Sequence, residues 1–466
     1  MKEPPRSRIL RRELLRHART LERLAAELER AEDYPTQTAA AFCGLIRSTA
    51  TLLAERIPSA PGTKLQHIHA VLTRLGQHLR YAERSRIEHT PWSMVQATEA
   101  FLKEQTGPNS MFIIRPQWSY NYGIVGDFVT TYRSLIESLS DWITLEDWLA
   151  AIGSVAVKQI FCVSFPRVEK MNVLMHVSWG HEIGHILATE WLALHFDKLW
   201  KEAEPRIIER IQRDALKKTG GLKDRDLIAR ELTARLASET MRLTQVGLQE
   251  LISDFVGAHL FGPASILSVN ELSTRFELDI NPLDHGCYPP WRYRLRKLCG
   301  AVRRDFVGTS LPTSLRPYGR ALREIEVLTK ASTDLEVIKA NIQTREAYAL
   351  IEKNWRLITR EIKKRLPAAS RGRYQFHLRA SILKQLVERI AEGIPPNEIG
   401  GWPDAKPAAL ADIWNAAWAY VCSRIEADDS WGSHADYQDV FQLVLKAIEA
   451  SFVHSTFQPA LTRKSQ

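Results

Sequence analysis

The stretch from His176 to Trp191, HVSWGHEIGHILATEW, limits what this chain can fold into more than any other part of the sequence. It places His181 and His185 four residues apart, with Glu182 between them, in a run that is otherwise mostly apolar. Residues four apart on an α-helix lie about 40° from each other around the axis, so both imidazoles would project from one face. Burying two histidines and a glutamate on such a helix is unfavourable unless the groups are paired or bind a ligand.

The spacing H-E-x-x-H is typical of zinc sites in which two histidines bind the ion and the glutamate accepts a proton from metal-bound water. A zinc ion in a hydrolase is held by three protein ligands and keeps one open position. Glu250, in the apolar stretch LQELISDFVGAHLFGPA, is the best candidate for the third ligand. Asp254 lies four residues later on the same helical face and can accept the N–H of a liganding histidine, with His181 as the expected donor. The alternative interpretation is a plain amphipathic helix with two acidic residues.

HEIGH followed by ELISD resembles the gluzincin zinc metallopeptidases, whose pattern is H-E-x-x-H and then E-x-x-x-D on a following helix. The long interval between His185 and Glu250 is closest to that of the CAAX-prenyl-protease and heat-shock-protease group. That group also carries a later H-P-P-x-x-x-R-[IL] segment, which YPPWRYRL matches at Pro289, Pro290, Arg294 and Leu295. Tyr288 stands where the group has its histidine, and no membrane span accompanies the motifs. The resemblance covers residues 155–300.

The resemblance implies a zinc-dependent metallopeptidase that hydrolyses a peptide bond in a protein or peptide substrate. His181, His185 and Glu250 would bind Zn²⁺. Glu182 would be the general base that accepts the proton of the attacking water.

Two further roles follow from the same resemblance. The hydrogen-bond donor to the oxyanion would be either Tyr288, at the family position, or His285, on the loop just before it. Arg294 would brace the site through a carboxylate such as Asp254. The β-prone run KQIFCVSF, residues 158–165, would offer a sheet edge on which an extended substrate could pair.

The hydrophobic pattern predicts a mainly α protein with an α+β core. We expect a helical region over residues 1–109, a zincin-like catalytic core with a small sheet over 110–300, and a helical region over 301–466. Within the core, a charged, helix-prone stretch over 201–242 is interrupted by Gly220 and predicts an inserted helical hairpin. Short strands are expected within 110–129 and 158–165, and the H-E-x-x-H helix is expected to begin near Asn172.

Near the N-terminus, Leu14, Leu21 and Leu28 repeat every seven residues. Such a narrow apolar seam indicates either a short coiled coil or, as we favour, a helix that packs on its own chain. The terminal helical regions are candidate surfaces for a protein partner.

The composition of the chain argues against several other classes of protein. The five cysteines form no C-x-x-C pair, which argues against a cysteine zinc knuckle and a disulfide framework. No run of 18 apolar residues suggests a membrane span, and the first residues lack the apolar core of a signal peptide, so we expect a cytoplasmic protein. The net charge of +9 and basic stretches such as RGRYQFHLR leave a less favoured alternative. This is a nucleic-acid-binding or scaffold protein with a structural or degenerate zinc site.

Overall fold

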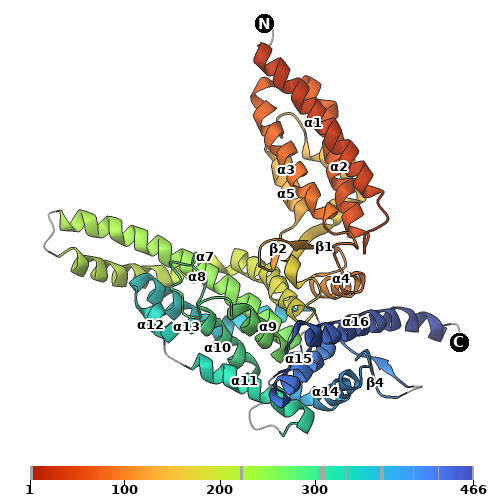
Figure 1. The fold of residues 1–466 in the computed structure, drawn as a ribbon. Coiled ribbons are helices and arrows are strands. Elements are labelled where there is room, and N and C mark those ends of the chain that lie inside the picture. The colour runs from red at the N-terminus through yellow and green to blue at the C-terminus, as the bar shows by residue number, and fades with distance from the viewer. Residues whose placement is uncertain are drawn as a thin grey trace. The chain divides into compact units, whose positions relative to one another are not determined.

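In its described part the chain is mostly helical, with a sheet of three strands and a second sheet of two short strands, which confirms the expected mainly α class (Figure 1). The structure, a computed structural model, describes residues 4–220, 224–303, 310–330, 333–367, 372–401, 404–428 and 430–463. The chain divides into two compact units, Met1–Met171 and Asn172–Gln466. Their boundary falls inside the range 110–300 that the sequence suggests as one catalytic region.

The three-stranded sheet belongs to the first unit and has the order β1-β3-β2. Strands β1 (Ser110–Gln117) and β3 (Gln159–Pro166) pair in parallel along their whole length, and β2 (Gly123–Val125) pairs antiparallel with β3. Both stretches in which strands were expected therefore contain them. The expectation that KQIFCVSF is a sheet edge is wrong, because β3 is the central strand: β1 pairs with it along its whole length, and β2 pairs with residues 162–164 on its other side.

Six α-helices accompany this sheet in the described part of the first unit: α1 (Pro5–Glu29), α2 (Thr38–Arg56), α3 (Leu65–Glu83), α4 (Trp92–Thr106), α5 (Phe128–Glu137) and α6 (Leu145–Ile152). Leu14, Leu21 and Leu28 are buried, and α1 packs on α2 and α3. The heptad seam is therefore used within the chain, as we favoured, because neighbouring helices of the same unit cover it.

The second unit is built around two long helices, α7 (Trp179–Lys218) and α8 (Arg225–Phe261), which form a helical hairpin (Figure 1). The elements that follow are α9 (Pro263–Ser273), α10 (Trp291–Val302), α11 (Arg316–Thr329), α12 (Thr333–Lys339), α13 (Ile342–Arg365), α14 (Phe376–Ala391), the two-stranded pair β4 (Glu398–Ile399) and β5 (Lys406–Pro407), α15 (Leu410–Ala427) and α16 (His434–Arg463). Short 3₁₀ turns occupy Ile57–Ser59, Gly62–Lys64, Gly153–Val157, Arg167–Glu169, Met175–Ser178 and Thr313–Leu315.

Two boundaries differ from the sequence expectation. The H-E-x-x-H helix begins at Trp179 and not near Asn172, because residues Met175–Ser178 form a separate 3₁₀ turn. The charged stretch 201–242 is not a separate insertion, since both of its ends fall inside α7 and α8. The hairpin is a direct continuation of the two helices that carry the candidate site.

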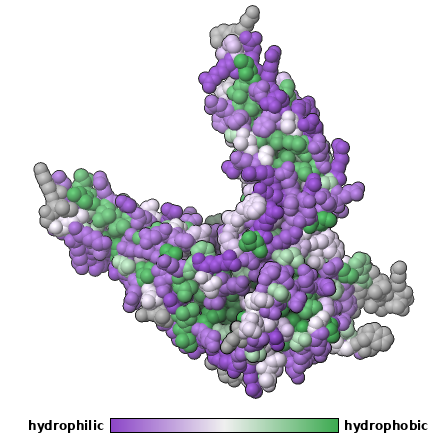
Figure 2. Space-filling model, in the orientation of Figure 1, coloured by the Kyte–Doolittle hydropathy of each residue, from purple (hydrophilic) through white to green (hydrophobic). Residues whose placement is uncertain are grey.

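Packing on the hairpin comes mainly from α13, which contacts both α7 and α8, while α10 packs on α8. Pro205 lies inside α7 and has no N–H to donate to the carbonyl of Lys201, so the helix lacks one of its backbone hydrogen bonds there. The distal part of the hairpin has a mainly hydrophilic surface with scattered hydrophobic residues such as Leu227 (Figure 2). Among the described helices, none carries an apolar stretch of the length that crossing a bilayer requires.

Candidate metal centre

Three glycines allow α7 and α8 to approach each other at the site. A Cβ atom at Gly180 would lie 2.7 Å from the Phe261 ring, and one at Gly184 would lie 2.7 Å from the carbonyl oxygen of Ser253. From the other helix, a Cβ atom at Gly257 would lie 3.2 Å from the backbone nitrogen of His181. The two helices are therefore in backbone contact where the histidines of α7 face the acidic residues of α8.

The two histidines converge on the carboxylate of Glu250. Nε2 of His181 lies 3.5 Å from Oε2 of Glu250, and Nε2 of His185 lies 3.7 Å from Oε1. Glu182 contributes a carboxylate to the same place, since ligand atoms of His181, Glu182 and His185 all lie within 4.8 Å of one another. The predicted ligands and the predicted base are thus brought together by two helices.

These distances suit a tetrahedral zinc ion. Ligand atoms bound at 2.0–2.2 Å in tetrahedral geometry lie about 3.4 Å from each other, close to the two nitrogen–oxygen distances found here. The donor set of two imidazoles and one carboxylate is one that zinc accepts in hydrolases. Glu182 also offers an oxygen to this group, so His181, Glu182 and His185 form a second set of three potential ligands.

Asp254 and Arg294 contact the candidate ligands His181 and Glu250 through hydrogen bonds and ion pairs. Nδ1 of His181 lies 2.9 Å from Oδ1 of Asp254, which is the contact that the sequence predicts. Arg294 donates to both oxygens of Asp254 at 2.8 Å, and its Nη1 lies 3.2 Å from Oε2 of Glu250. The guanidinium also lies over the ring of Trp291, 4.4 Å from its centroid. All of these charged side chains except His181 are at least 95% buried.

The buried charges set the protonation of the two histidines in opposite directions. For His181, burial alone would lower the pKa, but the hydrogen bond to Asp254 and the nearby Glu250 outweigh it and raise the pKa to about 10. For His185, burial and the positive charge on His181 lower the pKa to about 4. The carboxyl pKa values of Glu250 and Asp254 are lowered, because Arg294 and the histidines offset the effect of burial. At neutral pH, His185 therefore offers a free lone pair.

His185 is incompletely satisfied in this arrangement. Its Nδ1 is buried and has no hydrogen-bond partner among the described residues. Its Nε2 is 3.7 Å from Glu250, which is too long for a hydrogen bond. A cation between the two histidines and Glu250 would give Nε2 a partner, but Nδ1 would still lack the carboxylate or carbonyl that usually orients a liganding histidine.

The loop before α10 carries both candidate oxyanion donors. Tyr288 is 46% exposed, and its pKa is raised by partial burial and by the charges of Glu250 and Glu182. His285 is exposed, with its ring 5.9 Å from that of Tyr288. Between them, Cys287 adopts a left-handed backbone with φ of 76°. The influence of Glu250 and Glu182 on the pKa of Tyr288 is the observation that associates this residue with the site.

No family model matches this chain, and no curated protein or solved structure does. We therefore infer the function from the geometry of the site. Six predicted residues lie in one cluster: His181, Glu182, His185, Glu250, Asp254 and Arg294. Tyr288 is linked to it by the effect of the carboxylates on its pKa. The glycine contacts, the Trp291 ring under Arg294 and the unsatisfied His185 were not foreseen. Only the glycines left a signal in the sequence: Gly180 and Gly184 are four residues apart, a spacing that permits close helix packing.

Proposed function

We propose that this protein is a zinc-dependent metallopeptidase of the gluzincin type, with a zincin-like core, that cleaves a specific protein partner. The observation that carries the proposal is the convergence of Nε2 of His181 and Nε2 of His185 on the carboxylate of Glu250. Asp254 on His181 supports it, because a carboxylate behind a liganding histidine fixes the tautomer that leaves Nε2 free for the metal.

Zinc held by His181, His185 and Glu250 would act as a Lewis acid that polarises the scissile carbonyl and activates water at neutral pH. The residues of the chain would perform the remaining work. Glu182 would accept a proton from the attacking water and deliver it to the leaving amine nitrogen. Tyr288 would donate its phenolic O–H to the carbonyl oxygen as that oxygen gains negative charge.

One observation favours a rival function. His181 and Arg294 carry two positive charges that balance the two negative charges of Glu250 and Asp254 without any metal. Such a cluster can serve purely as a buried structural ion-pair network. The protein would then be a scaffold or a nucleic-acid-binding protein, with a structural or degenerate site.

Metal analysis combined with cleavage assays tests the proposal. Purified full-length protein should hold about one zinc ion per chain, His181→Ala should lose it, and Glu182→Gln should keep it. Wild-type protein should cleave members of a fluorescence-quenched peptide mixture, and Glu182→Gln should not. A wild-type protein that binds no added zinc would overturn the proposal, as would full cleavage by the Glu182→Gln variant.

A further inference from the structure

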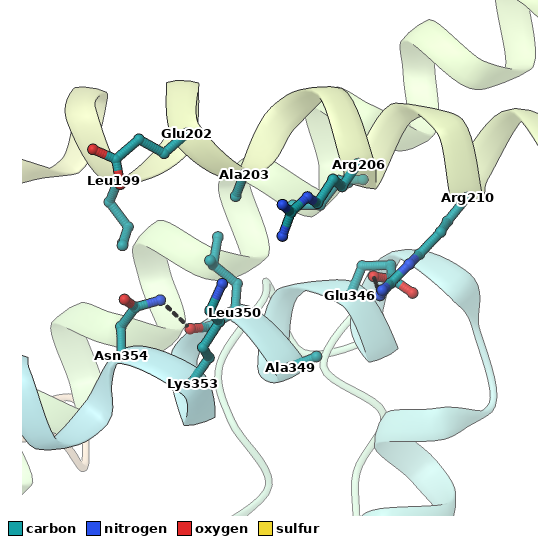
Figure 3. A pocket seen from close by; sticks show the side chains of 11 residues that line it. Leu199, Glu202, Ala203, Arg206, Arg210, Glu346, Ala349, Leu350, Lys353 and Asn354 are labelled. Carbon is teal, nitrogen blue, oxygen red and sulfur yellow. Dashed lines mark hydrogen bonds and ion pairs between the residues drawn. The ribbon is translucent and has the colours of Figure 1, made fainter.

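A pocket of about 160 Å³ lies between α7 and α13, away from the candidate metal centre (Figure 3). Its floor is apolar and is formed by Leu199, Ala203, Ile207, Ala349 and Leu350. Leu199 lies fourteen residues after His185 in the sequence, which corresponds to about 21 Å along the helix at 1.5 Å per residue. The pocket is therefore a separate feature of the same long helix.

Two cations on the rim of this pocket form no ion pair among the described residues, although one carboxylate, Glu202, also lines the pocket. Arg206 on α7 and Lys353 on α13 point into the gap between the helices from opposite sides (Figure 3). Neither forms an ion pair with any residue that the structure describes. By contrast, the third cation of the rim, Arg210, lies 2.8 Å from the buried carboxylate of Glu346 and is already neutralised. Two like charges that converge on one pocket favour an anionic group between them.

The positive charge continues along α13 beyond the pocket. Arg356, Arg360 and Lys364 follow Lys353 at spacings of three or four residues, and all are exposed, so they form one basic face of the helix. Arg356 has no ion-pair partner among the described residues, while Arg360 and Lys364 share the single carboxylate of Glu361. We call the pocket together with these residues the α13 docking surface.

We propose that the α13 docking surface binds an acidic peptide segment of a partner protein, which inserts an aliphatic side chain into the pocket and places carboxylates at Arg206 and Lys353. An acidic-aliphatic peptide matches both the apolar floor and the two cations. A nucleic-acid backbone matches only the cations and would leave the apolar floor without a partner. The binding of this segment does not depend on catalysis; that the segment belongs to a substrate rests on the proposed peptidase function.

Fluorescence anisotropy tests this inference on the full-length Glu182→Gln variant, in which a bound substrate would remain intact. The probe is a short fluorescein-labelled peptide of glutamate and leucine, compared with the same peptide carrying lysine for glutamate and with a labelled oligothymidylate. We expect the acidic peptide to bind and each of Arg206→Glu and Lys353→Glu to weaken its binding by about 10-fold or more, because each reversal replaces an attraction by a repulsion. Lys384→Glu, an exposed reversal on α14, should change binding less than about twofold.

A second variant tests the contribution of the apolar pocket to binding separately from that of the cations. Ala349→Phe, at an exposed position of the pocket floor, should weaken binding similarly because the ring fills the pocket, with circular dichroism showing an intact fold. Equal binding by the wild-type pocket and by both charge reversals would overturn the proposal, and so would binding of oligothymidylate in preference to the acidic peptide. Zinc content is measured in the same samples. Zinc without peptide binding would reject only the α13 docking surface, and peptide binding without zinc would reject only the peptidase.

Discussion

Gly184 of α7 lies directly against the backbone of Ser253 of α8, so that a Cβ atom at Gly184 would be 2.7 Å from the carbonyl oxygen of Ser253. Contacts this short do not occur between real Cβ atoms and backbone, and the backbone of a helix cannot give way locally. The absence of a side chain at Gly184 is therefore required for the close spacing of the two helices that carry the candidate metal ligands.

Replacing Gly184 with Ala should push the helices apart. We expect the free energy of unfolding to fall by about 1–3 kcal/mol, as for other overpacked sites, and zinc binding to weaken because Glu250 moves away from the histidines. Thermal unfolding and zinc titration measure the two effects. Gly300→Ala on α10 is the matched control, since a Cβ there meets no atom within 4 Å; it should be neutral or stabilising by up to about 1 kcal/mol. Equal behaviour of the two variants would contradict the contact.

Removing Arg294 should destabilise the second unit strongly. Arg294→Leu leaves Asp254 and Glu250 buried without their main counter-charge, and breaking a buried pair in this way costs about 3–5 kcal/mol. Chemical denaturation of the metal-free protein measures the loss. Arg320→Leu removes a partner of Glu426 from a half-exposed pair and should cost less than about 1 kcal/mol. A comparable loss in both variants would show that the Arg294 cluster is not the stabilising element proposed here.

Zinc binding should release a proton from His181. The pKa of this histidine is raised to about 10 in the metal-free protein, chiefly by Asp254 and Glu250 against the opposing effect of burial. A metal ligand must be deprotonated, so binding at about pH 8 should release about one proton from the protein. Titration calorimetry in buffers of different ionisation enthalpy counts that proton. Binding without net proton release would mean that His181 is already neutral.

The same raised pKa predicts how the stability of the metal-free protein depends on pH. Because the folded pKa exceeds the unfolded value of about 6.5, protonated His181 contributes its full stabilisation below that value. The contribution is lost as pH rises from about 6.5 toward 10. The stability difference between wild type and His181→Gln should therefore shrink over this window, and a difference that grows with pH would contradict the assignment.

Tyr288 should be the donor to the oxyanion. Its pKa is raised by burial and by the carboxylates of the site, so it remains a protonated donor throughout the neutral range. Tyr288→Phe should lower turnover by about 10²-fold with zinc retained, as expected for the loss of one oxyanion donor. His285→Ala should leave turnover nearly unchanged. If His285→Ala carries the loss instead, the roles of the two residues are reversed.

The strained backbone at Cys287 offers a test of how Tyr288 is held. A non-glycine residue at φ of 76° carries a steric penalty that glycine does not. Cys287→Gly should be more stable than Cys287→Ala by about 1 kcal/mol, since both lose the thiol but only glycine relieves the backbone. Denaturant unfolding of the two variants makes the comparison. A more stable alanine variant would show that the left-handed conformation is unstrained.

The sequence predicted the helices and strands well wherever the pattern was local. Leu14, Leu21 and Leu28 marked the buried face of α1, and the β-branched and aromatic run at residues 158–165 marked β3. The position of β3 within the sheet could not be predicted, because strand order depends on pairing partners distant in sequence. The relation of the hairpin to the site was missed for a similar reason: high charge suggested an insertion, whereas α7 continues to Lys218 and α8 begins at Arg225, so the stretch belongs to the two helices that carry the site.

Within the site, helical spacing was enough to place His181 and His185 on one face and Asp254 one turn from Glu250. The contact from Asp254 to His181 was anticipated from residue type and position, and the resemblance to the gluzincins implied that Arg294 contacts a carboxylate such as Asp254. The protonation of the two histidines could not be anticipated. It depends on which imidazole receives the Asp254 hydrogen bond and which remains without a partner, and only the three-dimensional arrangement decides that.

Helix α7 extends from the candidate ligands to the tip of the hairpin as one unbroken element of 40 residues. The part of α7 beyond His185 is about 50 Å long at 1.5 Å per residue. If it moved as a rigid rod, a displacement of about 4 Å at its tip would tilt the helix by only about 5° at the histidines. The helix bends most easily at Pro205, because one backbone hydrogen bond is missing there, between the candidate ligands and the tip. Bending of the distal hairpin would therefore concentrate at Pro205, between the tip and His185.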